Sequence, residues 1–200
     1  MDLPDFPHLT ILEPQDDAWS ARVPDHHWVG VNWSCLLALG DGRTAWAKFM
    51  TVDRANSRAV VRPDDPAHLS WLRPGDSCAF FDGYYGERVE LVLGAPRQWS
   101  QVRYVPADPS ADGRPSVGTW SAAEAGTEAA RQVADGASDH EHCSICSGKI
   151  GYGGDELGYG SEQGDWICLA CHREWILPRS IAFALDWIGG ARNPSPRAGP

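Results

Sequence analysis

Long hydrophobic runs are missing from this chain of 200 residues. The longest apolar stretches, such as residues 34–39, fall far short of the ~20 consecutive apolar residues that a membrane-spanning helix needs. The first residues, Met1–Asp5, place no basic region before an apolar stretch, so we expect no secretory signal. These absences predict a cytoplasmic protein that does not associate with a membrane.

Positive charge is also scarce. The chain has 17 Lys and Arg residues against 27 Asp and Glu residues, and its formal net charge is −10 at pH 7. Proteins that bind nucleic acid usually present a basic face to the phosphate backbone. The charge therefore disfavours a nucleic-acid partner. It favours a basic protein partner, because complementary charge raises the rate of association.

Cysteine is present in a pattern that indicates metal binding. Four of the six cysteines form the pairs Cys143-x-x-Cys146 and Cys168-x-x-Cys171, separated by 21 residues. In a reducing compartment such pairs are expected to bind metal rather than to form disulfides. The spacing is that of a structural site for one Zn²⁺ ion. A shell of four sulfurs leaves no open position for water, which argues against a metalloenzyme.

Other interpretations of these residues stay open. Two redox pairs would need a βαβ context that the sequence does not display, and the thiols could simply be buried. His140 and His142, beside the first pair, could replace a cysteine or bind a second metal, but we expect them at the surface. His172 directly follows Cys171 and is expected to point away from the metal.

The fold class expected from the sequence is α+β. Residues 1–106 predict a β-rich domain, built as a small antiparallel barrel or a strongly bent sheet, with an irregular arm over residues 1–25. Asp41-Gly42 is a hairpin signal between two apolar segments. The expected strands are residues 28–33, 34–39, 44–52, 58–62, 77–81, 87–93 and 99–105.

Composition changes after residue 106. Residues 107–142 are rich in Ala, Gly and Asp, which predicts a linker. A capping box of Ser121 and Glu124 would allow a helix over residues 121–135. Residues 143–188 predict a zinc module that ends in a helix over about 179–188, and residues 189–200 predict a mobile tail.

The order of elements around the cysteines resembles the treble-clef class of zinc fingers. Gly148 suits a tight turn after the first pair, residues 150–164 predict a hairpin, and a strand is expected to enter Cys168. A helix would leave from Cys168, and its N-terminus would stabilise a thiolate. The resemblance covers residues 140–177 and implies a folded scaffold, with no particular activity.

Two further resemblances bear on function. Cys168-x-x-Cys171-His172 resembles the second metal half of HNH nucleases, but residues 147–167 contain neither the His nor the Asn that those enzymes need. The segments Asp139–Cys146 and Asp165–Cys171 resemble part of small uncharacterised bacterial cytoplasmic proteins. Some of those proteins are associated with toxin-neutralising, immunity-like roles, which implies a protein toxin as the partner.

Residues 82–88 are the candidate interaction surface of the β-rich part. Adjacent tyrosines between glycines suit a recognition loop, because Tyr gives a large contact area at low entropic cost. The alternative is a hairpin tip whose aromatic rings fold back onto the sheet. The residues proposed for the surface are Tyr84, Tyr85, Glu87 and Arg88.

No catalytic residue is assigned. Cys35 and Cys78 are expected to be core thiols, although either could pair in space with His26, His27 or His68. The expected function is that of a non-enzymatic, zinc-binding protein-interaction protein. The alternatives are a hydrolase or nucleic-acid-processing enzyme with a site on the β domain, and a nucleic-acid-binding zinc finger protein.

Overall fold

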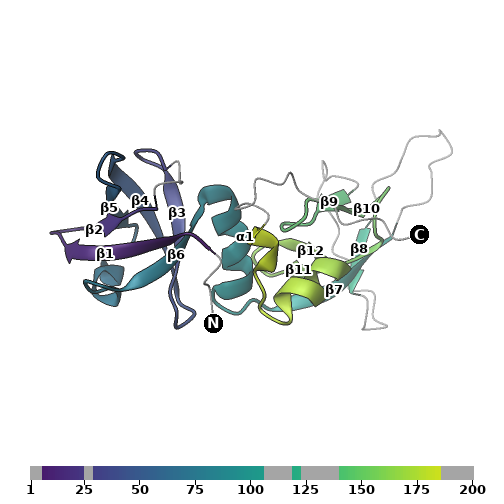
Figure 1. Ribbon diagram of the computed structural model, residues 1–200. Helices are drawn as coiled ribbons and strands as arrows, with labels where there is room; N and C mark the ends of the chain where they lie inside the picture. The colour runs from purple at the N-terminus through teal and green to yellow at the C-terminus, as the bar shows by residue number, and fades with distance from the viewer. Residues whose placement is uncertain (1–5, 25–28, 106–118, 123–139, 186–200) are drawn as a thin grey trace. The chain divides into compact units, whose positions relative to one another are not determined.

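Figure 1 shows the computed structural model of the chain, which describes residues 6–24, 29–105, 119–122 and 140–185. The chain divides into two compact units. Unit 1 comprises Met1–Ala95 and Ile181–Asn193, and unit 2 comprises Pro96–Ser180 and Pro194–Pro200. Among the described residues, no helix has the length and apolar character needed to cross a membrane.

Unit 1 is built on a closed barrel of six antiparallel strands in the order β1-β2-β5-β4-β3-β6. This confirms the predicted antiparallel barrel. Closure leaves no unpaired sheet edge. The strands are β1 (His8–Pro14), β2 (Trp19–Arg22), β3 (Ser34–Ala38), β4 (Thr44–Asp53), β5 (Arg58–Pro63) and β6 (Ser77–Asp82), and a single helix of 3₁₀ type, η1 (Pro66–Trp71), lies between β5 and β6.

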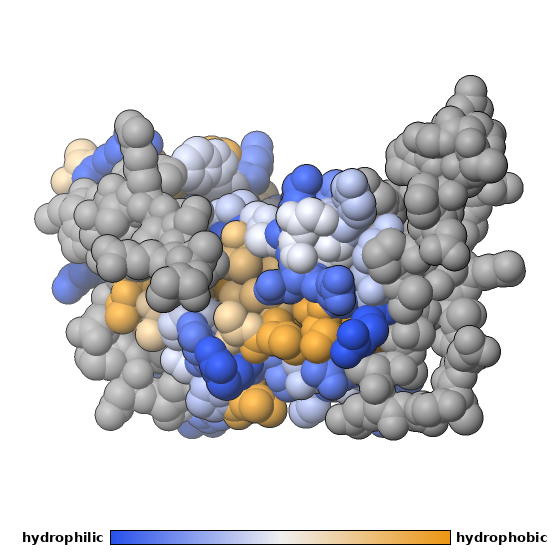
Figure 2. All heavy atoms as spheres, turned by 90° about the vertical axis from the view of Figure 1, so that its right-hand side faces the viewer, coloured by the Kyte–Doolittle hydropathy of each residue, from blue (hydrophilic) through white to orange (hydrophobic). Residues whose placement is uncertain are grey.

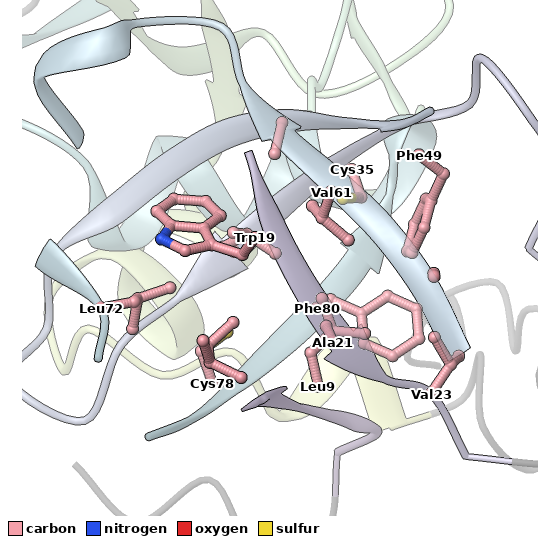
Figure 3. Close-up of a cluster of buried hydrophobic side chains, with 14 of the residues drawn as sticks. Leu9, Trp19, Ala21, Val23, Cys35, Phe49, Val61, Leu72, Cys78 and Phe80 are labelled. Atoms are coloured by element: carbon pink, nitrogen blue, oxygen red, sulfur yellow. The ribbon is translucent and has the colours of Figure 1, made fainter. Parts of the chain in front are cut away.

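The core of the barrel follows from side-chain alternation along the strands. In β5, Ala59 and Val61 are buried whereas Arg58 and Arg62 are exposed. Figure 3 shows the inward-facing side chains gathered between the strands. The buried cluster contains Leu9, Ile11, Trp19, Ala21, Cys35, Leu37, Ala47, Phe49, Val61, Cys78 and Phe80.

The expected irregular arm at the N-terminus is wrong for its central part. β1 pairs with β2 on one side and with β6 on the other, and the β1–β6 pairing closes the barrel. Leu9 and Ile11 alternate with more exposed neighbours and face the core. Three of the Pro and Asp residues that suggested an arm, Pro14, Asp16 and Asp17, lie where the chain turns between β1 and β2. Of the strand expected over 28–33, residues 29–33 form no strand, and Trp28 lies outside the described residues.

The segment expected to be a strand over residues 87–93 is helical. Helix α1 (Gly83–Leu93) follows β6 directly, and the Asp82 carboxylate caps it by accepting a hydrogen bond from Tyr85 N at 2.9 Å. Val89, Val92 and Leu93 are its buried apolar residues. Their spacing of three and four is helical, whereas the alternation of Val89, Leu91 and Leu93 had suggested a strand.

Helix α1 covers the outer face of the barrel at β3 and β6. Leu36 and Phe81 point outward from these strands, yet both are fully buried. Gly86 permits the close approach: a Cβ there would lie 2.9 Å from the Trp46 ring and 3.0 Å from Leu36 Cβ. β3 is therefore buried on both faces, which explains its continuous apolar sequence.

Unit 2 contains a four-stranded antiparallel sheet in the order β12-β11-β7-β8 and a two-stranded sheet of β9 and β10. We expected residues 99–105 in the β-rich domain, but they pair with β11 in unit 2. Residues 119–122, expected in a linker with a helix from 121, form a strand. The bounds are β7 (Trp99–Val105), β8 (Thr119–Ala122), β9 (His140–His142), β10 (Lys149–Gly151), β11 (Leu157–Ser161) and β12 (Trp166–Cys168).

The helices after β12 are short. α2 (Leu169–Cys171) continues into a π-type segment, η2 (His172–Ile176), which gives the helix expected after Cys168. Of the helix expected over 179–188, the described residues show a 3₁₀ turn, η3 (Ala182–Ala184), followed by Leu185 in α-helical conformation. No helix begins at Arg179, because its positive φ of 52° is incompatible with a helix. Residues 186–188 lie outside the described residues.

The two cysteines of the barrel are core thiols, as predicted. Cys35 and Cys78 are buried inside the barrel. Burial raises the pKa of Cys78 to about 12 and raises that of Cys35 further, because the apolar interior disfavours the thiolate. Both groups therefore stay protonated at neutral pH, and neither is available as a nucleophile.

Substitution of Gly86 tests the packing of α1 on the barrel. We predict that Gly86→Ala lowers the free energy of unfolding of the chain by about 1–2 kcal/mol, because the new methyl group overpacks Trp46 and Leu36. Gly83→Ala, in the same helix, meets only the Ser34 carbonyl oxygen at 3.9 Å and is expected to be neutral or stabilising. Urea unfolding measures both variants, and equal effects would contradict the packing.

The buried thiols predict a stability that depends on pH. Between pH 9 and about pH 12 the folded barrel retains thiol protons that the unfolded chain loses. The free energy of unfolding should therefore fall as pH rises, by about 1.4 kcal/mol per pH unit for each thiol. Urea unfolding from pH 7 to pH 11 measures the slope. A Cys35→Ala/Cys78→Ala variant should show a shallower slope, and an unchanged slope would count against this prediction.

Candidate metal centre

The first cysteine pair lies in the tight turn that joins β9 to β10. Cys143 N donates to the Gly148 carbonyl at 2.8 Å, and Ser147 N donates to the Cys143 carbonyl at 2.8 Å. The positive φ that we expected of a glycine belongs to Ser147, at 60°. Gly148 instead donates a hydrogen bond from its backbone N–H to Cys146 Sγ at 3.4 Å. A Cβ at this position would lie only 3.2 Å from that sulfur, so glycine leaves room for it.

The second pair lies where β12 becomes helix α2. Cys168 is the N-cap, and its Sγ accepts a hydrogen bond from Cys171 N at 3.4 Å. Both sulfurs are thus close to the first turn of the helix, where unpaired N–H groups favour negative charge. The predicted strand-to-helix arrangement at the second pair is confirmed.

A backbone hydrogen bond links the two cysteine pairs. Ser144 N, inside the first pair, donates to the Trp166 carbonyl at the start of β12, at 2.7 Å. The four Sγ atoms of Cys143, Cys146, Cys168 and Cys171 lie within 4.8 Å of one another. All four predicted ligands therefore come together at one point.

The sulfur positions suit a tetrahedral ion. Cys146 Sγ and Cys168 Sγ are 3.8 Å apart, and all four cysteines are free thiols. A tetrahedral shell with metal–sulfur bonds of about 2.3 Å has sulfur–sulfur edges of about 3.8 Å, whereas a disulfide bond is about 2.0 Å long. The four cysteines can thus hold a metal ion such as zinc.

The site is largely shielded from solvent, and its thiols shift one another's pKa. Cys143, Cys168 and Cys171 are buried and Cys146 is half-buried. Hydrogen bonds from the other three thiols lower the pKa of Cys143, and hydrogen bonding to Cys143 raises the pKa of Cys168. A divalent cation at the centre would displace the thiol protons, because thiolates are the ligand form of cysteine.

The hairpin between the pairs differs from the one expected over 150–164. β10 pairs back with β9, and the hairpin is formed by β11 and β12. Ile150 on β10 is fully buried and packs against β11 at Gly158, where a Cβ would lie 2.8 Å from the Ile150 side chain. The glycine of β11 thereby lets the turn that carries the first pair rest against the strand beside the second pair.

The ring of His172, the residue after Cys171, packs against the four-stranded sheet. Its ring stacks on Tyr159 of β11, with ring centres 3.6 Å apart and planes 15° from parallel, and meets Trp99 of β7 edge-on. Burial lowers the pKa of His172, which favours the neutral ring. His172 is not one of the clustered ligands. Its ring contacts hold the helical segment after Cys171 against the sheet.

An ion pair closes the β11–β12 turn. Arg97 pairs with Asp165, and the Asp165 carboxylate also accepts a hydrogen bond from the Ser161 hydroxyl at 3.0 Å. Asp165 N donates back to the same hydroxyl at 3.1 Å, and Gly164 takes the positive φ of the turn. These contacts fix the strand that leads into Cys168.

The predicted interaction residues lie in the first turns of α1 rather than in a loop. Tyr84 and Glu87 are exposed, Tyr85 is half-buried, and Arg88 is buried. The structure brings Tyr84 and Arg88 together: the guanidinium lies over the Tyr84 ring, 3.8 Å from its centre, and donates a hydrogen bond to the Tyr84 hydroxyl. This is an i, i+4 pair, as helical geometry requires.

Several other residues can now be placed. His140 and His142 lie on β9, outside the group of four sulfurs. His26 and His27 lie outside the described residues. In the part of the chain that the structure describes, the four cysteines are the only group of three or more metal-binding side chains. No protein-family model, curated protein sequence or solved structure matches the chain.

Removal of one sulfur tests the metal centre. We predict that Cys143→Ser abolishes stoichiometric metal binding and unfolds the β9–β12 region, because three remaining ligands leave a small unit without its closing ion. Plasma mass spectrometry measures metal content and amide hydrogen exchange measures protection in each unit. Cys78→Ser, at a buried thiol of the barrel, should leave metal content unchanged. Retention of metal by Cys143→Ser would refute the assignment.

Proposed function

We propose that the chain is a non-enzymatic protein-interaction protein that holds one structural Zn²⁺ ion. Support for zinc comes from the ligand set: four thiolates in a tetrahedral arrangement are a preferred shell for this ion. All four positions belong to the protein. Such an ion has no place for a substrate or an activated water, so its role is to stabilise unit 2.

The zinc module is proposed to be of treble-clef type. A turn with two ligands is followed by the β11–β12 hairpin, and a helix with the second pair of ligands completes the module. The strands β7 and β8 extend that hairpin into a larger sheet. On this interpretation the metal module stabilises the four-stranded sheet, and recognition of the partner takes place on another part of the chain.

The proposed recognition surface lies on unit 1, where β3 begins and β6 ends. Cys35 is paired with Asp82 across these strands, so the residues just before β3 and at the start of α1 occupy the same end of the barrel. Trp33 is 45% exposed and Tyr84 is 54% exposed there. The sequence pattern had identified Tyr84 but not Trp33, which had been assigned to a strand.

These exposed aromatic residues are the single observation that carries the proposal. Large rings are costly to leave in water, and Trp, Tyr and Arg are the residue types that dominate binding energy at protein interfaces. Val31, 54% exposed, belongs to the same loop as Trp33. Arg88 stacks against Tyr84 and holds that ring in place, which reduces the entropic cost of binding.

Exposed apolar residues that occur singly are weaker evidence for an interaction surface. Tyr152 and Leu177 of unit 2 are also exposed, but single residues of this kind are common on protein surfaces. On the face shown in Figure 2, hydrophobic residues appear as separate areas among hydrophilic residues. Trp33 and Val31 lie in the loop that leads into β3, and Tyr84 lies in the helix that follows the paired end of β6, so all three belong to one end of the barrel.

The expected partner is a basic protein. A net charge of −10 would speed association with a positively charged surface and slow association with an acidic one. A toxin-neutralising role follows from the sequence resemblance of the cysteine segments to immunity-like proteins. A basic toxin, such as a nuclease, would meet the charge requirement.

A nucleic-acid partner is disfavoured by the charges around the zinc module. Arg97, Arg103 and Arg173 each form an ion pair with a carboxylate of the same unit. Paired cations contribute little to phosphate binding, because the acidic partner repels the backbone. The enzymatic alternative would need a second cluster of catalytic groups. Among the described residues, the four cysteines are the only group of three or more metal-binding side chains, so that alternative would need catalytic groups of another kind.

Removal of the exposed rings tests this function. We predict that Trp33→Ala/Tyr84→Ala loses at least tenfold in affinity for the partner, because such rings contribute about 2 kcal/mol or more at an interface. Tyr152→Ala removes an equally exposed ring from unit 2 and should bind normally. The measurement is affinity capture from the host, carried out both with and without nuclease treatment, followed by calorimetry with the purified partner.

Two results of this experiment would contradict the proposal. Full binding by the Trp33→Ala/Tyr84→Ala variant would exclude the proposed surface. Recovery of nucleic acid in place of a basic protein would exclude the proposed class of partner.

A further inference from the structure

Two histidines on β9 form a second convergent pair of ligand atoms. His140 and His142 are two residues apart in a strand, so both side chains rise from the same face. Their Nε2 atoms are 3.2 Å apart. Glu141, between them, points to the opposite face, and neither imidazole belongs to the group of four sulfurs.

The hydrogen bond of His142 fixes which nitrogen is free to bind a cation. His142 Nδ1 lies 3.0 Å from the Ser147 carbonyl oxygen. A carbonyl oxygen only accepts hydrogen bonds, so Nδ1 carries the proton and the neutral ring presents a lone pair at Nε2. A second-sphere bond of this kind to a backbone carbonyl is the usual way in which a protein orients a metal-binding imidazole.

The two Nε2 atoms form a hydrogen bond with each other, with ring centres 4.9 Å apart and ring planes inclined at 79°. Because His142 carries its proton at Nδ1, its Nε2 accepts and His140 Nε2 donates. A shared cation would displace that single proton, and both nitrogens would then be ligands.

The separation of the two nitrogens matches that of two ligands on one metal ion with Zn–N bonds of about 2.0–2.1 Å. Two imidazole nitrogens bound to one ion at angles of about 90–109° lie about 2.9–3.4 Å apart, which includes the observed distance.

We propose that His140 and His142 bind a second divalent transition-metal ion through their Nε2 atoms, at a site distinct from the four-cysteine centre. Imidazole nitrogen suits Zn²⁺, Ni²⁺ and Cu²⁺. The protein supplies two ligands, and His142 is exposed, so water completes the coordination. Unlike the sulfur site, this one has open positions. The ion would bind reversibly and with modest affinity.

The test titrates Ni²⁺ into the full-length chain loaded with one equivalent of Zn²⁺, followed by calorimetry. We expect one Ni²⁺ site in the micromolar range. His140→Ala should weaken it at least tenfold, and Glu141→Ala, a matched change on the opposite face, should leave it unchanged. Zinc content, measured on the same samples by plasma mass spectrometry, should stay at one ion per chain in all three proteins.

Other results would overturn the proposal. Absence of the Ni²⁺ site from the unmodified chain would do so, as would equal Ni²⁺ binding by His140→Ala and the unmodified chain. Loss of Zn²⁺ in step with Ni²⁺ uptake would show that nickel enters the sulfur site instead. Because His142 also bonds to the turn of the first cysteine pair, His140→Ala is the decisive variant. Nickel-induced broadening of both histidine ring signals in NMR spectra should accompany binding.

Discussion

Convergence of four sulfurs at one point is the constraint on which unit 2 depends. Neither cysteine pair can close a coordination shell alone, so the β9–β10 turn and the β12–α2 junction must meet. The backbone bond from Ser144 to Trp166 holds them together, and Gly158 leaves room for Ile150 between them. The Arg97–Asp165 pair and the stack of His172 on Tyr159 then secure the adjoining turn and helix. A metal ion in this shell would supply stability that so small a core cannot.

Unit 1 is stabilised in a different way, by apolar burial on both sides of its barrel wall. The inner cluster fills the barrel, and α1 covers the outward-facing Leu36 and Phe81. Helix α1 also carries Tyr84, with Arg88 against its ring. The proposed recognition surface is thus built on a rigid element next to the barrel. In our account one unit recognises a partner, and the other is held by its metal ion.

The local chemistry of the metal centre could be predicted from the sequence, whereas much of the chain's organisation could not. The spacing of the paired cysteines indicates a tetrahedral metal site, and the Asp41-Gly42 sequence indicates a hairpin turn. Pairing partners are not encoded locally: residues 8–14 close a barrel with a strand about seventy residues later, and residues 99–105 pair with 157–161. Residues 87–93 fit both a strand and a helix, and the Asp82 cap together with burial against β3 decides for the helix. Exposure of Trp33 has no signal in the sequence, because a lone Trp is usually core.

X-ray absorption spectroscopy of the purified, metal-loaded chain tests the central claim most directly. The account predicts one tightly bound zinc ion per chain whose first shell contains four sulfurs at about 2.3 Å. Saturation of the weaker histidine site is avoided by dialysis before measurement. A first shell for the tightly bound ion that includes oxygen or nitrogen, or cysteines joined as disulfides with no metal, would contradict it.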